Sequence, residues 1–243
     1  AAAPQLTFFG LTLNKSAGVV VSSTESWTVA GVYTNTSGDL INTGNTVTFT
    51  GTANRAFAVN GGTVQFNNLT VTMSAGFDRN HTAGSFNIIG NYLCNGGGFN
   101  STTGTTTFDG GAAATLDHTS AGVTTFNNLT INKTAVGLTS TTGTFTVSIN
   151  MVVQGTSTYT ATGGTATFGG ATAGNITNSS AAGAPQMTFF NLTINKTAAV
   201  TMIADGVISA NGSFSNAGQG SFLASAGGLQ TPWQVNQNGT LVT

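Results

Sequence analysis

The chain has 243 residues, a formal net charge of −1 and 5% charged residues, far below the ~25% of an ordinary globular domain. So little charge leaves no basic surface for nucleic acid or an anionic membrane, and no apolar run reaches the roughly 18 residues of a membrane span. Regularly placed phenylalanines, 16 in all, argue against disorder. The single cysteine, Cys94, excludes an intrachain disulfide framework, and we expect a small core residue there rather than a reactive thiol or an intermolecular bridge.

The chain begins with AAAPQLTFF, and its small first residues are typical of a mature chain after removal of a signal peptide. A trimmed fragment would begin in the same way. We expect an extracellular protein, either secreted or held at the cell surface.

A repeat of about 60 residues organises the chain, and its first anchor is a Phe placed three residues before Leu-Thr. The interval between successive anchors is nearly constant and lengthens slightly toward the C-terminus. The copies are TFFGLTLNK at Phe8, QFNNLTVTM at Phe66, TFNNLTINK at Phe126 and TFFNLTINK at Phe189.

The repeats predict a single domain over residues 1–228, followed by a segment at 229–243 that matches no repeat. We expect that last segment to act as a cap or as a strand that joins subunits. The four repeats of the domain cover residues 1–61, 62–122, 123–183 and 184–228.

Each long repeat divides into units of about 20 residues, each with its own anchor. Apolar residues alternate with Thr, Ser and Asn at the anchors, and Gly- and Asn-rich dipeptides separate them, which indicates short strands between turns. The further anchors are SWTVAG (Trp27), SFNIIG (Phe86), TFTVSI (Phe145), TVTFTG (Phe49), TTTFDG (Phe108) and TATFGG (Phe168).

Short strands in such units fit two all-β architectures. We predict a β-solenoid, or parallel β-helix, of about 12 rungs of ~20 residues, three to each long repeat, in a rod about 55–60 Å long. The alternative is a tandem β-sandwich with strand donation between subunits, although a seven-stranded sandwich needs about 100 residues. In the solenoid, we expect the anchor phenylalanines to lie in phase and form a core stack: Phe66, Phe86, Phe108, Phe126, Phe145, Phe168, Phe189 and Phe222.

The charged residues offer only weak candidates for catalysis. FDRNHT contains Asp78, Arg79 and His81, and LDHT contains Asp117 and His118 in the next repeat. These residue types suit acid–base chemistry or metal binding, but their scatter also fits charged turns that keep the rod soluble, which is the interpretation we favour. We therefore assign no catalytic residue, no metal ligand and no cofactor.

Three lysines, Lys15, Lys133 and Lys196, recur at one position of the long repeat, where the second copy has Met73. We expect a sparse solubilising row on the rod surface, with neighbours roughly 14 Å apart, rather than a binding site.

Asn-x-Ser/Thr sequons are abundant, and those beside the first anchor are candidate glycosylation sites: Asn68, Asn128 and Asn191. A chain rich in Asn, Ser and Thr also creates sequons by chance. Asn in a solenoid forms amide ladders along the coils, and we favour ladders over glycans.

The first residues already belong to the repeat, so Leu6, Phe8 and Phe9 are expected at an open end of the solenoid. The related stretch APQMTFF at residues 184–190 follows a whole upstream repeat, and the C-terminal rung of another copy offers a similar surface. A heterologous contact of this kind does not close and generates a filament. The predicted subunit interface comprises Pro4, Leu6, Phe8, Phe9, Leu11, Pro232, Trp233, Val235 and Leu241.

The stretches TFTVSINMVVQGTSTYTATGGTATFGG and FFNLTINKTA resemble repeat regions of secreted bacterial β-solenoid proteins of the adhesin kind. The resemblance covers nearly all of the chain except the C-terminal segment 229–243, and it implies a cell-surface or matrix role without catalysis. Our leading hypothesis is a structural subunit of a self-assembling extracellular filament, whose partner is another copy of itself. The alternatives are a cell-surface adhesin or glycan-binding module and, less favoured, a β-helix enzyme that degrades polysaccharides.

Overall fold

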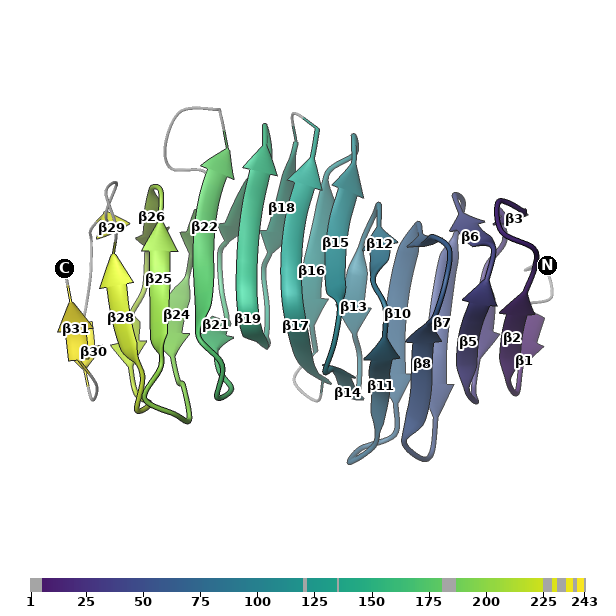
Figure 1. The fold of residues 1–243 in the computed structure, drawn as a ribbon, viewed down its shortest axis with the longest axis horizontal. Helices are drawn as coiled ribbons and strands as arrows, with labels where there is room; N and C mark the ends of the chain where they lie inside the picture. The colour runs from purple at the N-terminus through teal and green to yellow at the C-terminus, as the bar shows by residue number, and fades with distance from the viewer. Residues whose placement is uncertain are drawn as a thin grey trace.

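The molecule is a rod in which the chain coils around one long axis, as Figure 1 shows. This computed structural model describes residues 6–119, 122–134, 136–180 and 187–224, together with strands at 229–230, 235–237 and 240–242. The described elements are 31 strands, and strands of successive coils pair in parallel. The prediction of an all-β solenoid is therefore confirmed.

Each coil contributes one strand to each of three faces. The first face consists of β1 (Leu6–Phe8), β4 (Trp27–Val29), β7 (Thr46–Gly51), β10 (Asn68–Met73), β13 (Tyr92–Cys94), β16 (Ala114–His118), β18 (Gly137–Ser140), β20 (Thr158–Ala161), β23 (Met187–Phe189), β26 (Ile208–Ala210) and β29 (Leu229–Gln230). The second consists of β2 (Leu11–Asn14), β5 (Tyr33–Ser37), β8 (Arg55–Val59), β11 (Asp78–Ala83), β14 (Gly97–Ser101), the first halves of β17 (Gly122–Lys133) and β19 (Thr144–Gly155), β21 (Thr165–Phe168), β24 (Asn191–Ile194), β27 (Phe214–Asn216) and β30 (Val235–Gln237). The third consists of β3 (Val20–Ser23), β6 (Asp39–Asn42), β9 (Val64–Phe66), β12 (Phe86–Ile88), β15 (Thr105–Gly110), the second halves of β17 and β19, β22 (Gly174–Ser180), β25 (Thr201–Asp205), β28 (Ser221–Ala224) and β31 (Thr240–Val242).

The number of turns is smaller than predicted. The chain completes nine turns between β1 and β26 and one more between β26 and β29, so the first face has 11 strands, one for each described coil. The prediction of about 12 rungs was too high because most coils are longer than the sequence unit on which it was based. The interval from Leu6 to its partner Trp27 is close to that unit, whereas the interval from Tyr159 to its partner Met187 is clearly longer.

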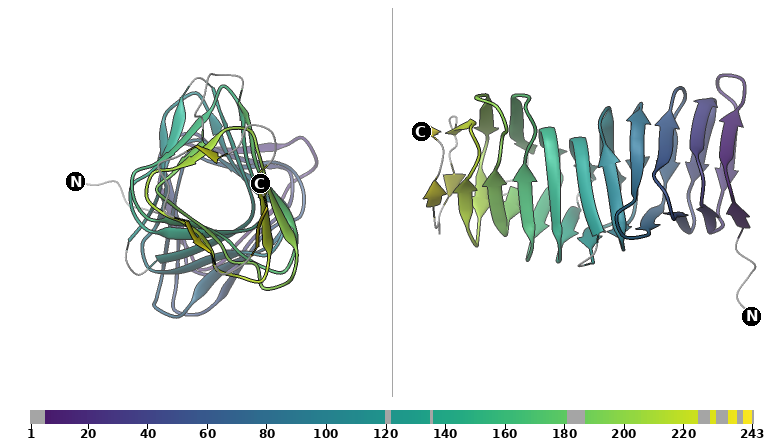
Figure 2. Two further views of the ribbon diagram at one scale, coloured as in Figure 1. Left: turned by 90° about the vertical axis from the view of Figure 1, so that its left-hand side faces the viewer. Right: turned by 90° about the horizontal axis from the view of Figure 1, so that it is seen from below.

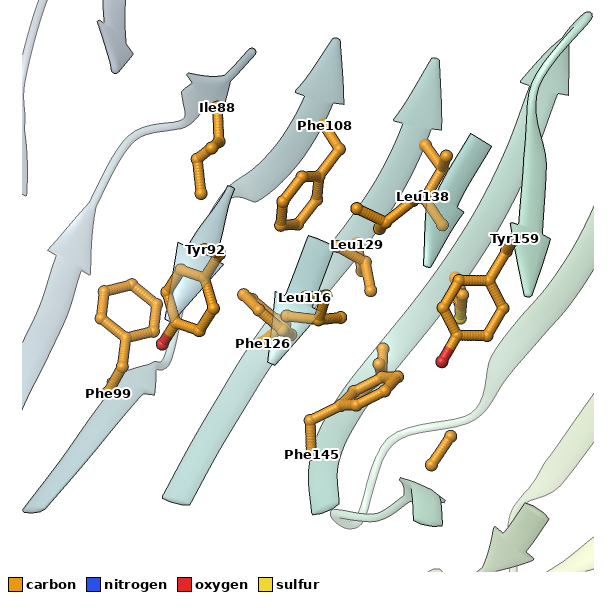
Figure 3. Close-up of a cluster of buried hydrophobic side chains, with 14 of the residues drawn as sticks. Ile88, Tyr92, Phe99, Phe108, Leu116, Phe126, Leu129, Leu138, Phe145 and Tyr159 are labelled. Carbon is orange, nitrogen blue, oxygen red and sulfur yellow. The ribbon is translucent and has the colours of Figure 1, made fainter. Parts of the chain in front are cut away.

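The coils surround one interior that runs through the rod, and Figure 2 shows the ribbon end-on. Apolar side chains from the three faces fill this interior, and Figure 3 shows a cluster of them in close-up. The period-two pattern produces this core: in β17, Phe126 and Ile131 are buried, while Thr125 and Thr130 remain partly exposed on the outside. The predicted core phenylalanines are all buried: Phe66, Phe86, Phe108, Phe126, Phe145, Phe168, Phe189 and Phe222.

These phenylalanines do not form one stack in phase, because the long repeat is not three coils long. Phe8 ends a strand of the first face, Phe66 ends one of the third face, and Phe126 lies in the half of β17 on the second face. Phe189 then returns to the first face. Each long repeat thus advances the chain by two turns and two further faces. The repeated phrase marks a corner of the rod, and it moves to another corner at each copy.

In the column of the third face that contains Ile88, a ring alternates with an aliphatic side chain, whereas Tyr33, Phe57 and His81 are direct partners in a column of the second face. Ile88 pairs with Phe66 in the preceding coil and with Phe108 in the following coil. The rings meet instead as diagonal neighbours: the Phe66 and Phe86 centroids are 6.0 Å apart in an edge-to-face arrangement. Aromatic rings prefer this geometry to a face-to-face sandwich.

Replacing Ile88 by Phe tests this alternation. A third ring in the column between Phe66 and Phe108 overfills the interior, so we expect Ile88→Phe to destabilise the protein by about 1–3 kcal/mol. The matched control, Ile88→Val, removes one methyl group and should cost about 1 kcal/mol. Denaturant unfolding measures both. An Ile88→Phe protein as stable as the wild type would support stacked phenylalanines and contradict the observed columns.

Candidate assembly interface

The first described coil, β1 to β3, presents three strand edges. Within the described chain, β1 pairs only with β4, β2 only with β5 and β3 only with β6. Each of these strands therefore has a row of N–H and C=O groups on its outer side that no described strand pairs. Such edges are ready templates for the addition of another strand.

The apolar side chains of this coil are open to solvent where their counterparts in later coils are not. Leu6 begins a column of paired residues that continues through Trp27 and Val47. The exposed fraction of the side chain falls along this column from 61% at Leu6 to 4% at Trp27 and 0% at Val47. Leu6 therefore occupies a position that belongs to the core in later coils, but no described coil covers it.

An apolar cavity of about 170 Å³ opens at this end of the rod. Its lining includes Leu6, Phe8 and Leu11, three of the predicted interface residues, together with Trp27 of the second coil. Phe8 packs edge-on against Trp27, with ring centroids 6.1 Å apart. Phe9 differs from these residues: it lies at the corner between β1 and β2 and is 82% exposed.

The predicted interface residues of the C-terminal segment lie at the opposite end of the rod. Val235 belongs to β30 and Leu241 to β31, which pair in parallel with β27 and β28. The strands of residues 229–243 therefore add another coil in the register of the preceding ones. The remaining predicted interface residues, Pro4, Pro232 and Trp233, lie outside the described residues.

The prediction of a surface lysine row was wrong for two of its three members. Lys133 and Lys196 are buried, and only Lys15 is exposed. The Lys133 Nζ donates to the Asp109 carbonyl at 2.7 Å and to the Ile89 carbonyl at 2.6 Å. Burial lowers the pKa of Lys133 and lowers that of Lys196 to about 8, since desolvation penalises the charged amine.

Arg79 is fully buried, which contradicts its assignment to a charged turn. Its guanidinium lies over the Phe49 ring, 4.6 Å from the centroid, and backbone carbonyls accept its N–H groups. Burial and nearby Arg55 lower the pKa of Arg79 to about 10, so the side chain stays protonated at neutral pH. The alternation in FDRNHTA is the sequence signal for this burial, because it places Arg79 and His81 on one side of a strand. The carbonyl acceptors are those of Val29 (3.1 Å), Gly31 (2.5 Å), Thr50 (3.1 Å) and Ala56 (3.3 Å).

The two histidines are also buried, and the coil does not bring them together: His81 lies on the second face and His118 on the first, two coils further on. His81 stacks on Phe99 and His118 on Phe145, with centroids 6.2 Å and 6.3 Å apart. Among the described residues, no three His, Cys, Asp or Glu side chains gather as a metal site would require. No described helix is long and apolar enough to cross a membrane.

Cys94 occupies an apolar environment in the first face. Its side chain is buried, and burial raises the pKa of its thiol above the usual value. A raised pKa keeps the thiol protonated and weakly nucleophilic, as a core position requires.

The candidate glycosylation sites lie at corners of the rod and bond to neighbouring coils. The Asn128 and Asn191 side-chain nitrogens donate to the carbonyls of Gly104 and Gly164, at 3.0 Å and 3.1 Å. The Asn68 side-chain oxygen accepts from the Asn91 N–H at 2.8 Å. A glycan on Asn128 or Asn191 would replace an amide hydrogen at the nitrogen that makes this bond.

Comparison of the chain with models of protein families, with curated proteins and with solved structures found no match.

The buried histidines predict a pH-dependent stability. Desolvation lowers the pKa of His81 and of His118 to about 4, against about 6.5 in an unfolded chain. The unfolded state therefore binds more protons between pH 6.5 and 4, and stability falls as the pH falls through this window, by roughly 3 kcal/mol per histidine. Unfolding midpoints of the wild type and of the double variant His81→Leu/His118→Leu, measured from pH 7 to pH 4, check this. Parallel pH profiles for the two proteins would contradict burial of neutral histidines.

Proposed function

We propose that this protein is a structural subunit of an extracellular filament, which grows head to tail when the first coil of one copy stacks on the last coil of another. The observation that carries the proposal is the apolar cavity at the β1–β3 end, where core side chains such as Leu6 and Phe8 meet solvent. Covering these side chains with another coil removes apolar surface from water and pairs the strand edges at the same time.

The two ends of the described rod have the same three-faced cross-section, which supports stacking of identical copies. The first face contains 11 strands, from β1 to β29, and the other two faces end in the same coil, at β30 and β31. The strands β1, β2 and β3 of one copy then extend the faces that end in β29, β30 and β31 of its neighbour. Such a contact is heterologous, and because it does not close on itself it produces a filament.

The composition supports the same role. With 5% charged residues and a net charge of −1, stacked copies repel each other little. The ionisable side chains Arg79, His81 and Lys196 are committed to the interior, which supports a structural rather than a catalytic role. The extracellular location in this proposal rests on the resemblance to secreted bacterial solenoids.

Phe8→Asp tests the proposal. A carboxylate in the apolar cavity would be buried by a stacked coil without a partner, so we expect the variant to fold but to form no filaments. The matched control is Val123→Asp, which places the same charge at an exposed side chain of β17, away from either end.

Electron microscopy and sedimentation at increasing protein concentration provide the measurement, with circular dichroism to verify folding. Wild-type and Val123→Asp proteins should form filaments, and the Phe8→Asp protein should remain as short particles. Short wild-type particles at all concentrations, or filaments of Phe8→Asp as abundant as those of the wild type, would overturn the proposal.

A further inference from the structure

Buried lysines at the corners of the rod donate hydrogen bonds to backbone carbonyls of the preceding coils, and they do so in the same register. The Lys196 Nζ donates to the Gly169 carbonyl at 2.6 Å and to the Ser148 carbonyl at 2.7 Å. By strand register, Gly169 lies one coil before Lys196 and Ser148 lies two coils before it. The Lys133 Nζ reaches back in the same manner, to Asp109 one coil before and to Ile89 two coils before. Each lysine thus ties three successive coils together at one corner.

Where the second copy of the repeat lacks this lysine, an arginine bonds one of the two equivalent acceptors and the residues on either side of the other. Met73 occupies the lysine position and is buried. The Thr50 carbonyl there is the register equivalent of the Asp109 and Gly169 carbonyls, and it accepts from Arg79 at 3.1 Å. Two coils before Met73, the register equivalent of Ile89 and Ser148 is Ala30, and Arg79 bonds the carbonyls of its neighbours Val29 and Gly31. In each of the second, third and fourth copies of the repeat, a buried cation therefore bonds backbone carbonyls at this corner.

Lys15 occupies the same position in the first copy. Its backbone carbonyl, like that of Lys133, accepts a hydrogen bond from a serine hydroxyl. The Ser157 hydroxyl of the following coil donates to the Lys133 carbonyl at 2.8 Å, and the Ser37 hydroxyl of the following coil donates to the Lys15 carbonyl. The side chain of Lys15 nevertheless is exposed, unlike those of Lys133 and Lys196. The difference follows from position: Lys15 lies in the first described coil, and its acceptors would belong to the two coils before it.

We infer that Lys15 is the joint lysine of the assembly, and that its ammonium group is held by backbone carbonyls from the last two coils of a second copy. The inference rests on the proposed head-to-tail filament and names the residue that locks its joint. Lys15 follows β2 on the second face, and the last two described strands of that face are β27 and β30, so continued register brings Lys15 of one copy to this end of its neighbour. Charge-assisted hydrogen bonds from Lys15 to carbonyls in two coils of the neighbour would fix the rotation of one copy relative to the next and the direction of stacking. Apolar contact alone is not directional and fixes neither.

Lysine reactivity tests the inference, because the chain has only three lysines and they differ in burial. The probe is an N-hydroxysuccinimide acetate pulse, read by mass spectrometry, on unassembled protein and on filaments of the same chain. In unassembled protein, Lys15 should react while Lys133 and Lys196 are protected. In filaments, the Lys15 reaction rate should fall at least tenfold, toward that of the other two. All three lysines should react in denatured protein.

The outcomes separate this inference from the proposal beneath it. Absence of filaments would overturn the proposed function together with the joint. Filaments in which Lys15 stays as reactive as in unassembled protein would overturn the joint lysine and leave the filament standing. Protection of Lys15 already in unassembled protein would also overturn it, since another part of the same chain would then cover the amine.

Two substitutions give an independent test. Lys15→Met should fold normally, because Met73 shows that methionine fits this position. It should raise the critical concentration for filament growth roughly tenfold or more, since the carbonyls at the joint lose their charged donor. Lys15→Arg should stay close to the wild type, as Arg79 fulfils this role at another corner. A Lys15→Met protein that assembles at the wild-type critical concentration would contradict the inference.

Discussion

The structure depends on backbone hydrogen bonds that run parallel to the rod axis. The N–H and C=O groups of a strand inside the rod pair with the strand one coil before it and with the strand one coil after it. Trp27, for example, lies between Leu6 and Val47. The apolar interior follows from this arrangement, because each coil covers the side chains of its neighbour. No described strand pairs the outer side of β1, β2 or β3, and unpaired strand edges of this kind are templates for the addition of another strand.

Corners are the places where the ladder is interrupted, and their chemistry explains the unusual composition. Polar side chains there accept hydrogen bonds from the backbone of the next coil: Asp117 from the Thr141 N–H at 2.8 Å and Asn191 from the Ser213 N–H at 2.9 Å. Short amide and hydroxyl side chains suffice for these contacts, so few charges are needed. The cations Arg79, Lys133 and Lys196 face inward to carbonyls instead of outward to water.

The sequence alone predicted the solenoid, because alternation around anchors such as Phe126 and Phe168 reports a local property of each strand. The rotation of the repeat from face to face was missed, since it depends on corner lengths that show no period in the residues. The burial of Lys133 and Lys196 was missed for a related reason: their acceptors lie one and two coils away and meet them only through the register. The exposed apolar side chains of the first described coil could be predicted because the stretch around Phe8 recurs around Phe189, where the same side chain is buried.

In the proposed filament, identical rods stack into one continuous solenoid. Helical reconstruction of the assembled protein by electron cryomicroscopy tests it most directly. With 11 described coils at the ~4.8 Å strand spacing, we expect a subunit repeat of about 53 Å along the axis, with β1 of one copy beside β29 of the next in unbroken parallel register. Filaments built from rods packed side by side, or joined end to end without continuous strand pairing, would contradict it.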